Sequence, residues 1–292
     1  MCNISPKKPW TYCLNVMVLR LLNSINTKNP GLFFFLKDYN PIINNSIKNN
    51  KWETIACPVC DNDSFSDLFV KREEPFVRCN NCSLVLINPR PEYEEIKKTY
   101  DNDYSRDYAK KDKTKLKRSL KRVNLVKRNF GSEGRWLDVG CSAGFVVKAA
   151  SQCGFNAYGV DVEPWGINYG NTELGLNNLS VGLLENQAYP NEFFNVISLY
   201  DVIEHVPDLN TLAKELKRIL APNGVIDIVT PDIGHFRVTK PLSDWKEIKP
   251  SEHLYYFDKT TLNKLFSNHG LFITKKRFGL KASMKVCIQH II

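Results

Sequence analysis

The chain has 292 residues, of which 43% are hydrophobic and 24% charged. This composition is typical of a globular protein and excludes a disordered, collagen-like or coiled-coil chain. No segment reaches the roughly 18 uninterrupted apolar residues of a membrane helix. The apolar run Tyr12–Leu22 contains Arg20 and lacks a small-residue cleavage site, which argues against a secretory signal. We therefore expect a cytoplasmic protein with room for one large and one small domain.

The formal net charge of +9 is concentrated in one segment. Residues 106–128 contain eleven Lys or Arg and two Asp, which gives this segment alone a net +9. Three interpretations remain open: a solvated helix face, a surface for a phosphate-bearing or otherwise anionic substrate, and a nucleic-acid surface. The last is the weakest, because a single charged helix with only one interleaved aromatic, Tyr108, is weak evidence for it.

Residues 1–50 contain no motif, whereas residues 51–100 contain four cysteines in two pairs. Cys57 and Cys60 form one pair, Cys79 and Cys82 the other, and eighteen residues lie between them. A two-residue spacing places both thiolates of a pair on a tight turn, so the four can surround Zn²⁺ tetrahedrally. Four cysteine ligands leave no open coordination position, which predicts a structural zinc. The alternative is four unrelated free cysteines in a reducing compartment.

The following elements are predicted in chain order. A strand is expected at Ser83–Ile87, a rigid turn at Asn88–Pro91 and a helix at 92–100. An amphipathic helix is expected over 105–130, ended by Gly131. Its apolar face consists of residues three or four apart: Leu116, Leu120, Val123, Val126 and Phe130.

From residue 135 the pattern alternates between strands and helices, which predicts a parallel sheet covered on both faces. The expected strands are Trp136–Val139, Ala157–Val160, Asn178–Val181, Phe194–Tyr200 and Val225–Thr230. The expected helices between them are Gly144–Cys153, Pro164–Leu174 and Leu209–Leu220. A helix at Lys259–His269 and strands at Leu271–Phe278 and Ser283–Gln289 follow.

The turn after the first of these strands is built of small residues, Gly140 to Gly144, and leads into a helix. Such a turn lets a ligand approach the backbone and the free N–H groups of the helix. The dinucleotide fingerprint would need glycine at positions 142 and 145, where this chain has Ser142 and Phe145. Asp138, just before the turn, also favours a cationic or amine-bearing ligand over a pyrophosphate.

Asp161 lies 21 residues after Gly140, at the end of the second strand. An acidic side chain there can accept hydrogen bonds from both ribose hydroxyls of a nucleoside. The alternative role for Asp161 is that of a turn or capping residue.

The segments Leu137–Gly144 (LDVGCSAG), Tyr158–Asp161 (YGVD) and Asp201–Asp208 (DVIEHVPD) resemble the class I S-adenosylmethionine (SAM)-dependent methyltransferases over about residues 131–292. This resemblance implies an α/β, Rossmann-like, seven-stranded sheet with its last strand antiparallel, and SAM as cofactor. It implies cofactor contacts from Asp138, Gly140, Cys141, Ser142 and Gly144, a ribose contact from Asp161, and adenine contacts from Leu184 and Glu185. Ser142 departs from the glycine that many members carry.

A second segment, Arg78–Pro91, resembles the small N-terminal zinc module of methyltransferases of sugar and polysaccharide biosynthesis. The chain is therefore divided into an N-terminal segment (1–50), a zinc-ribbon-like module (51–100), a basic linker helix (101–130) and a methyltransferase domain (131–292).

Two histidines are candidate catalytic bases, His205 after the fourth strand and His253 after the fifth. Glu204 is a weaker candidate, and a structural role is the alternative for each histidine. Trp245, Tyr255 and Tyr256 are candidates for the apolar walls of a substrate pocket, unless their loop packs on the sheet.

We therefore predict a SAM-dependent methyltransferase acting on a small-molecule acceptor, such as a nucleotide-linked sugar or a glycan. One alternative is an RNA methyltransferase that docks RNA with its zinc module and basic helix. The other is a non-catalytic binding protein of the same fold.

Overall fold

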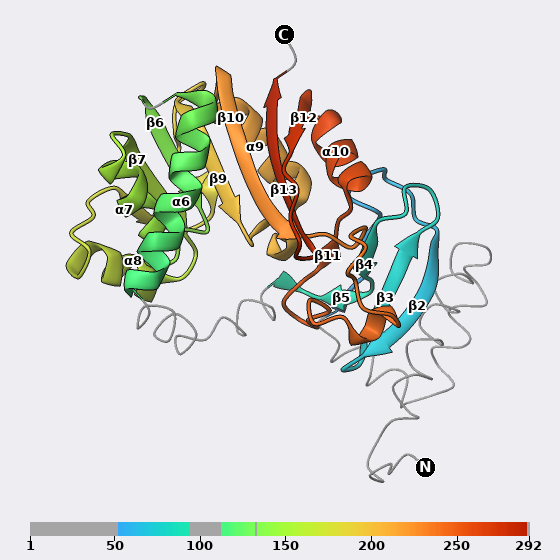
Figure 1. Ribbon diagram of the computed structural model, residues 1–292. Coiled ribbons are helices and arrows are strands. Elements are labelled where there is room, and N and C mark those ends of the chain that lie inside the picture. Colours follow the sequence, from blue (N-terminus) through green and yellow to red (C-terminus); the bar gives the residue numbers. More distant parts are fainter. Residues whose placement is uncertain (1–51, 94–111, 132, 291–292) are drawn as a thin grey trace.

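The computed structural model describes residues 52–93, 112–131 and 133–290. The segment 1–50 and most of the helix expected at 92–100 lie outside these residues. The described chain forms a large sheet between two layers of helices, with a smaller sheet beside it (Figure 1). Its helices include none long and apolar enough to cross a membrane.

The large sheet has seven strands in the order β12-β13-β10-β9-β6-β7-β8. Their bounds are β6 (Arg135–Val139), β7 (Asn156–Asp161), β8 (Leu179–Val181), β9 (Phe194–Tyr200), β10 (Leu220–Pro231), β12 (Leu271–Lys276) and β13 (Ser283–His290). Strand β13 pairs antiparallel with both β10 and β12, whereas β6 to β10 pair in parallel. The predicted fold class, with its last strand antiparallel, is confirmed.

The helices confirm the predicted alternation. They are α6 (Asp112–Phe130), α7 (Phe145–Gln152), α8 (Pro164–Thr172), α9 (Leu209–Ile219) and α10 (Lys259–Ser267). Asp208 and Asp258 cap α9 and α10, since each carboxylate accepts a hydrogen bond from the third N–H group of its helix. The helix expected to reach Leu220 ends one residue earlier, where β10 begins.

Strand alternation divides the core between the two faces of the sheet. On β6, Trp136 packs with Val147 of α7 and Val126 of α6, whereas Leu137 packs with Leu216 of α9 and Leu262 of α10. Because successive side chains of a strand point to opposite faces, Asp138 lies on the α6 and α7 side. The carboxyl ends of β6, β7 and β9 therefore meet at one edge, where the predicted site residues lie.

Helix α6 confirms the amphipathic pattern within its described residues. Val123 and Val126 are fully buried, and Leu116, Leu120 and Phe130 pack against the same cluster. Gly131, with φ of +96°, ends the helix and donates its N–H to the Lys127 carbonyl.

The small sheet has the order β11-β4-β3-β2 and is antiparallel throughout. Its strands are β2 (Phe65–Lys71), β3 (Glu74–Cys79), β4 (Val85–Ile87) and β11 (Tyr255–Tyr256), and a separate two-stranded pair joins β1 (Trp52–Glu53) to β5 (Arg90–Pro91). Only β4 was predicted. Strand β11 comes from the C-terminal half of the chain, so the cysteine-bearing sheet is completed by a distant segment.

Trp245, Tyr255 and Tyr256 are each at most 2% exposed. Tyr255 belongs to the main core, and Trp245 and Tyr256 pack with Phe76 behind the small sheet. The expectation that these rings form the walls of an open pocket is therefore wrong. The alternative, a loop packed into the interior, describes them.

Candidate functional site

The loop between β6 and α7 needs glycine at two positions. Gly140 and Gly144 have φ of +68° and +77°, which L side chains rarely adopt. A Cβ added at Gly140 would lie 2.5 Å from Val202 Cγ2, and one added at Gly144 would lie 2.6 Å from Leu176 Cδ1. The turn therefore has neither the conformational freedom nor the space for larger residues at these two positions, where the side chains of Val202 and Leu176 lie against the backbone.

Asp161 at the end of β7 holds this loop through backbone hydrogen bonds. Its Oδ2 accepts the Ser142 N–H at 2.7 Å, and its Oδ1 accepts the Glu163 N–H at 2.9 Å. Ser142 has φ of +47°, which explains in physical terms why glycine suits this position. Each carboxylate oxygen keeps a second lone pair for a hydroxyl donor, so the turn role and a ribose role are compatible.

Of the other predicted cofactor residues, Cys141 and Leu184 are buried and Glu185 is exposed. Cys141 and Leu184 are 5% and 4% exposed and lie in the core, so only their backbones face the edge of the sheet. Leu184 begins the short 3-10 helix η1 (Leu184–Asn186), and the next residue, Glu185, is exposed.

Asp138 is buried inside the sheet, with 3% of its surface exposed. Ser198 donates its hydroxyl to Asp138 Oδ1 at 2.6 Å, and Trp136 donates Nε1–H to the same hydroxyl oxygen at 2.8 Å. Burial raises the pKa of Asp138 to about 7, against the opposing effects of the Ser198 hydrogen bond and the Arg122 charge. The carboxylate is thus held close to neutral in the absence of a cationic ligand.

The 3-10 helix η2 (Ile203–His205) follows β9 and contributes two side chains to a second cluster. Glu204, His205 and His253 each offer a ligand atom within 4.8 Å of the others. The two imidazole rings are perpendicular, with centroids 4.7 Å apart. The structure therefore joins the two candidate bases, which lie far apart in the sequence, and adds Glu204 to them.

Both histidines have the same hydrogen-bond arrangement. His205 Nδ1 lies 2.7 Å from the Glu252 carbonyl oxygen, and His253 Nδ1 lies 2.9 Å from that of Glu247. Since a carbonyl oxygen only accepts, each Nδ1 carries the proton and each Nε2 has a free lone pair. Burial lowers the pKa of His205 to about 4 and that of His253 to about 3, so both rings are neutral near pH 7.

Glu204 is 1% exposed. Thr230 donates its hydroxyl to Glu204 Oε2 at 2.9 Å, whereas Oε1 has no hydrogen-bond partner among the described residues. Burial, together with the nearby Asp201 charge, raises the pKa of Glu204 to about 8. Sequence analysis indicated this residue only weakly, since its partner His253 comes from another segment.

The basic helix contributes one cation that sequence reasoning missed. Arg122 lies over the Tyr200 ring, 4.3 Å from its centroid, and 3.9 Å from an Asp201 oxygen. Part of the charge of α6 is therefore used within the molecule. Lys113, Lys117 and Lys121 remain exposed.

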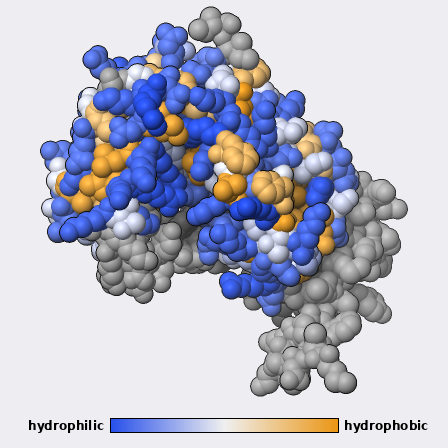
Figure 2. All heavy atoms as spheres, in the orientation of Figure 1, coloured by the Kyte–Doolittle hydropathy of each residue, from blue (hydrophilic) through white to orange (hydrophobic). Residues whose placement is uncertain are grey.

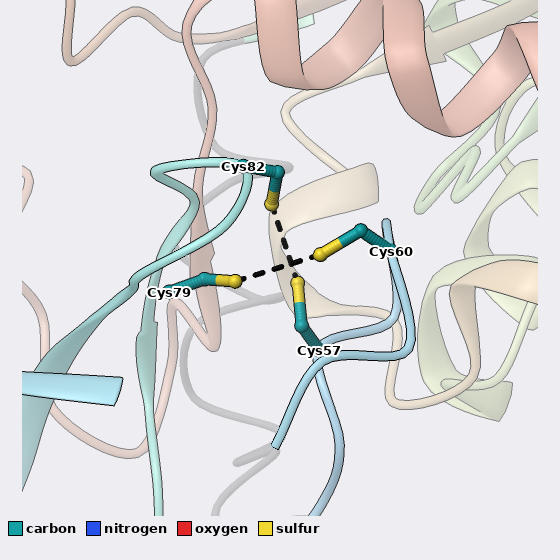
Figure 3. Close-up of side chains that lie close together, drawn as sticks. All are labelled: Cys57, Cys60, Cys79 and Cys82. Atoms are coloured by element: carbon teal, nitrogen blue, oxygen red, sulfur yellow. Dashed lines mark hydrogen bonds between the residues drawn. The ribbon is translucent and has the colours of Figure 1, made fainter. Parts of the chain in front are cut away.

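The four paired cysteines converge from two loops, as Figure 3 shows. The Sγ atoms of Cys57 and Cys82 are 3.4 Å apart, and those of Cys60 and Cys79 are 3.5 Å apart. A Zn–S distance of ~2.3 Å in a tetrahedron requires S···S distances of about 3.8 Å, so small movements suffice to place a zinc between them. The thiol set and its spacing therefore fit the metal.

The two cysteine loops have the same backbone pattern. Asp61 and Ser83, which follow the second cysteine of each pair, have positive φ and donate their N–H to the carbonyl of the first cysteine. Burial raises the pKa of Cys57, whereas at Cys79 the N–H donors of Cys82 and Asn81 outweigh burial and lower the pKa to about 6. Such N–H donors stabilise a thiolate, the form that binds metal.

A family model described as "Methyltransferase domain" matches residues 108–276. The chain belongs to the methyltransferase-domain family. The match includes the cofactor loop, Asp161 and the histidine pair. The matched residues begin after the four cysteines, so the match does not include them.

Curated relatives of this chain include two named ubiquinone biosynthesis O-methyltransferases. The protein from Bartonella tribocorum is 30% identical over 98 residues, which cover 32% of this chain and 40% of the relative. The protein from Actinobacillus pleuropneumoniae serotype 5b is 29% identical over 150 residues, which cover 43% of this chain and 64% of the relative. The matched region therefore spans less than two thirds of either relative.

Two solved structures share the fold of this chain at low identity. A TehB-like SAM-dependent methyltransferase from Corynebacterium glutamicum has a TM-score of 0.50 and 15% identity, covering 65% of this chain and 100% of its own. A chain from the complex of the Trm112 methyltransferase activator with a methyltransferase of Haloferax volcanii has a TM-score of 0.52 and 12% identity, covering 64% and 96%. At these identities the likeness shows the fold alone.

The raised pKa of Asp138 predicts a pH-dependent effect of Asp138→Asn in the ligand-free protein. The folded state holds a proton on Asp138 up to about pH 7, whereas the unfolded chain releases it near pH ~4. The wild-type protein therefore loses stability from this group as the pH rises from 4 to 7. The free energy of unfolding, measured with denaturant, should therefore be higher in the variant than in the wild type. This difference should be about 2 kcal/mol larger at pH 8 than at pH 5. Exposed Asp244→Asn is the control, and equal gains at both pH values would contradict the assignment.

Proposed function

We propose that this chain is a SAM-dependent methyltransferase that transfers a methyl group to a small-molecule acceptor. The observation that carries the proposal is the junction of the glycine loop with Asp161 at the carboxyl edge of the sheet, in a chain that belongs to the methyltransferase-domain family. SAM supplies a methyl carbon already activated by its sulfonium, so the protein has to bind, align and exclude water.

The proposed SAM site follows the edge of the sheet from β6 to β8. Gly140, Ser142 and Gly144 let the methionine part approach the backbone, and Asp138 lies behind them, where a cationic ligand would favour its ionised form. Asp161 accepts the ribose hydroxyls with its remaining lone pairs. Leu184 and Glu185, in the loop after β8, flank the adenine, and Cys141 contributes its backbone. The tight glycine turn at the end of β6 and its hydrogen bond to Asp161 support this arrangement.

We propose that the acceptor lies at the end of β9, where Glu204, His205 and His253 meet. Either imidazole has a free Nε2 that can receive a proton from the acceptor. The curated relatives named O-methyltransferases support an oxygen acceptor. A nucleotide-linked sugar or glycan is the acceptor class that the Arg78–Pro91 resemblance favours, and a cytoplasmic location agrees with it.

We further propose that Cys57, Cys60, Cys79 and Cys82 hold a structural zinc. The convergence of four sulfurs and the matching N–H donors of the two loops support this. The metal would hold the Cys57–Cys60 turn, which precedes β2, against the Cys79–Cys82 turn, which joins β3 to β4, and would take no part in the methyl transfer.

An RNA acceptor is the second candidate, since exposed Lys113, Lys117 and Lys121 form a basic face on α6. The inward role of Arg122 weakens it, because not all of the helix charge faces outward.

The first prediction concerns Asp161. Replacing it with Ala removes the acceptors for two hydroxyls and should weaken SAM binding by on the order of 1–3 kcal/mol in calorimetry. Asp161→Asn keeps one carbonyl acceptor and should show a smaller loss. Unchanged SAM affinity in a folded Asp161→Ala protein would remove the ribose assignment, and no SAM binding by the wild type would remove the proposed function.

The second prediction concerns the zinc. The purified protein should contain about one zinc held by the four cysteines, and Cys60→Ser should lower the zinc content, since a ligand is lost. Half-buried Cys153→Ser is the matched control and should leave it unchanged. Hydrogen exchange should rise in β3, β4 and β11 on zinc removal and stay slow in β6 and β7. Wild-type protein without zinc would contradict the site.

The third prediction separates the acceptor classes. If RNA binds α6, filter binding should fall steeply with salt, because each neutralised phosphate releases counterions. We expect weak RNA binding at physiological salt that is unaltered by the joint change of Lys113, Lys117 and Lys121 to Gln. Submicromolar binding lost in that variant would favour the RNA methyltransferase.

A further inference from the structure

The cluster of Glu204, His205 and His253 brings three ligand atoms within 4.8 Å of one another. Glu204 Oε1 is buried and has no hydrogen-bond partner among the described residues. Each histidine donates its Nδ1–H to a carbonyl oxygen, which leaves the Nε2 lone pair as the acceptor of that ring. A proton on the Glu204 carboxyl group would serve only one of these acceptors, whereas a cation among the three could be bound by all of them.

We propose that Glu204, His205 and His253 form a binding site for a divalent transition-metal cation, separate from the four-cysteine site. Two imidazoles and one carboxylate are a donor set suited to Zn²⁺, Mn²⁺ or Fe²⁺. Ligating histidines typically donate their other ring N–H to a carbonyl or carboxylate, which is the arrangement of both rings here. Glu204 has the matching support from Thr230 on its second oxygen.

The distances allow the site with small movements. The three ligand atoms lie within 4.8 Å of one another, whereas metal–ligand bonds of ~2.1 Å hold them about 3.0–3.4 Å apart. His205 is partly exposed, so a cation has a path to the site. Three protein ligands leave at least one coordination position for a further oxygen ligand.

The surrounding charges are mixed. Asp201 adds negative charge near Glu204 and raises its pKa. Lys249 is the opposing cation, but its Nζ lies 3.7 Å from an oxygen of Glu252, which offsets part of its charge. A bound cation would compensate the buried carboxylate without displacing either residue.

The consequence for the acceptor rests on the proposed methyltransferase function. An acceptor hydroxyl in the open position would have its pKa lowered by the cation and would lose its proton to water. Its oxygen would then form the new bond to the methyl carbon as the bond from that carbon to sulfur breaks, leaving neutral S-adenosylhomocysteine. The imidazoles would then act as ligands in place of free bases, and the acceptor would be an alcohol or phenol.

The test uses the full chain with its cysteine site filled by one equivalent of zinc. Mn²⁺ is added, and the free ion is counted by its electron paramagnetic resonance signal. One Mn²⁺ per chain should bind, and Glu204→Gln and His205→Ala should each weaken it roughly 10-fold or more. His235→Ala, which changes a histidine outside the cluster, is the matched control and should bind as the wild type does. Melting curves identify any variant that fails to fold. If Glu204→Gln fails to fold, the test rests on His205→Ala, because His205 is partly exposed.

Two results would overturn the cation site: no Mn²⁺ bound at about 1 mM, or equal affinity in folded Glu204→Gln, His205→Ala and wild type. SAM binding, measured by calorimetry on the same samples, tests the proposed function separately. A protein that binds SAM but no Mn²⁺ would retain the histidines as free bases, and one that binds Mn²⁺ but no SAM would retain the cation site alone.

Discussion

The backbone of one residue, Leu254, connects the two sheets at the candidate site. Its N–H donates to the Glu204 carbonyl at 2.8 Å, and its own carbonyl accepts the Ile87 N–H of β4 at 3.1 Å. The residue before it is His253, and the two after it form β11. Because Leu254 is fully buried, both bonds are protected from water and costly to lose. The distance between His253 and His205 therefore depends on how the small sheet is held.

The cysteine cluster connects the small sheet to the helices of the large sheet. In the Cys57–Cys60 turn, the Pro58 carbonyl accepts a hydrogen bond from Asn210 of α9, and the Val59 carbonyl accepts one from Asn268, at the end of α10. The Cys79–Cys82 turn joins β3 to β4, and β4 pairs with β11. One core also runs from Cys57 and Leu86 into the helices behind the large sheet. A metal between the four sulfurs would thus stabilise the geometry of the histidines from a distance, without contacting them.

The sequence predicted the large sheet well because its signals are local. Apolar strands such as Phe194–Tyr200, glycine turns and capping aspartates each act within a few residues. Strand β11 was missed because it has two residues and its partner β4 lies far along the chain. Strands β2 and β3 form a local hairpin, but its two turn residues, Arg72 and Glu73, have positive φ without the glycine or asparagine that marks such turns in a sequence. Likewise, the spacing of residues along the chain predicted the loop between β6 and α7 and Asp161. The proximity of Glu204 to His253 depends on a long-range contact that no sequence motif encodes. Whether these residues bind SAM and an acceptor remains a prediction.

Three carboxylates at the carboxyl edge of the sheet have the same electrostatic property. Burial is the largest cause that raises the pKa of Asp138, Asp161 and Glu204, and each is only partly compensated by hydrogen bonds or by Arg122. Like charges add to this, since Asp161 raises the pKa of Asp138 and Asp201 raises that of Glu204. The folded, ligand-free protein therefore stores an unfavourable charge arrangement along this edge. A cationic ligand would relieve it, and the proposed occupants fit: SAM carries a sulfonium and an ammonium, and a divalent cation would lie beside Glu204. Part of the free energy of binding would then come from charges that the fold has already desolvated.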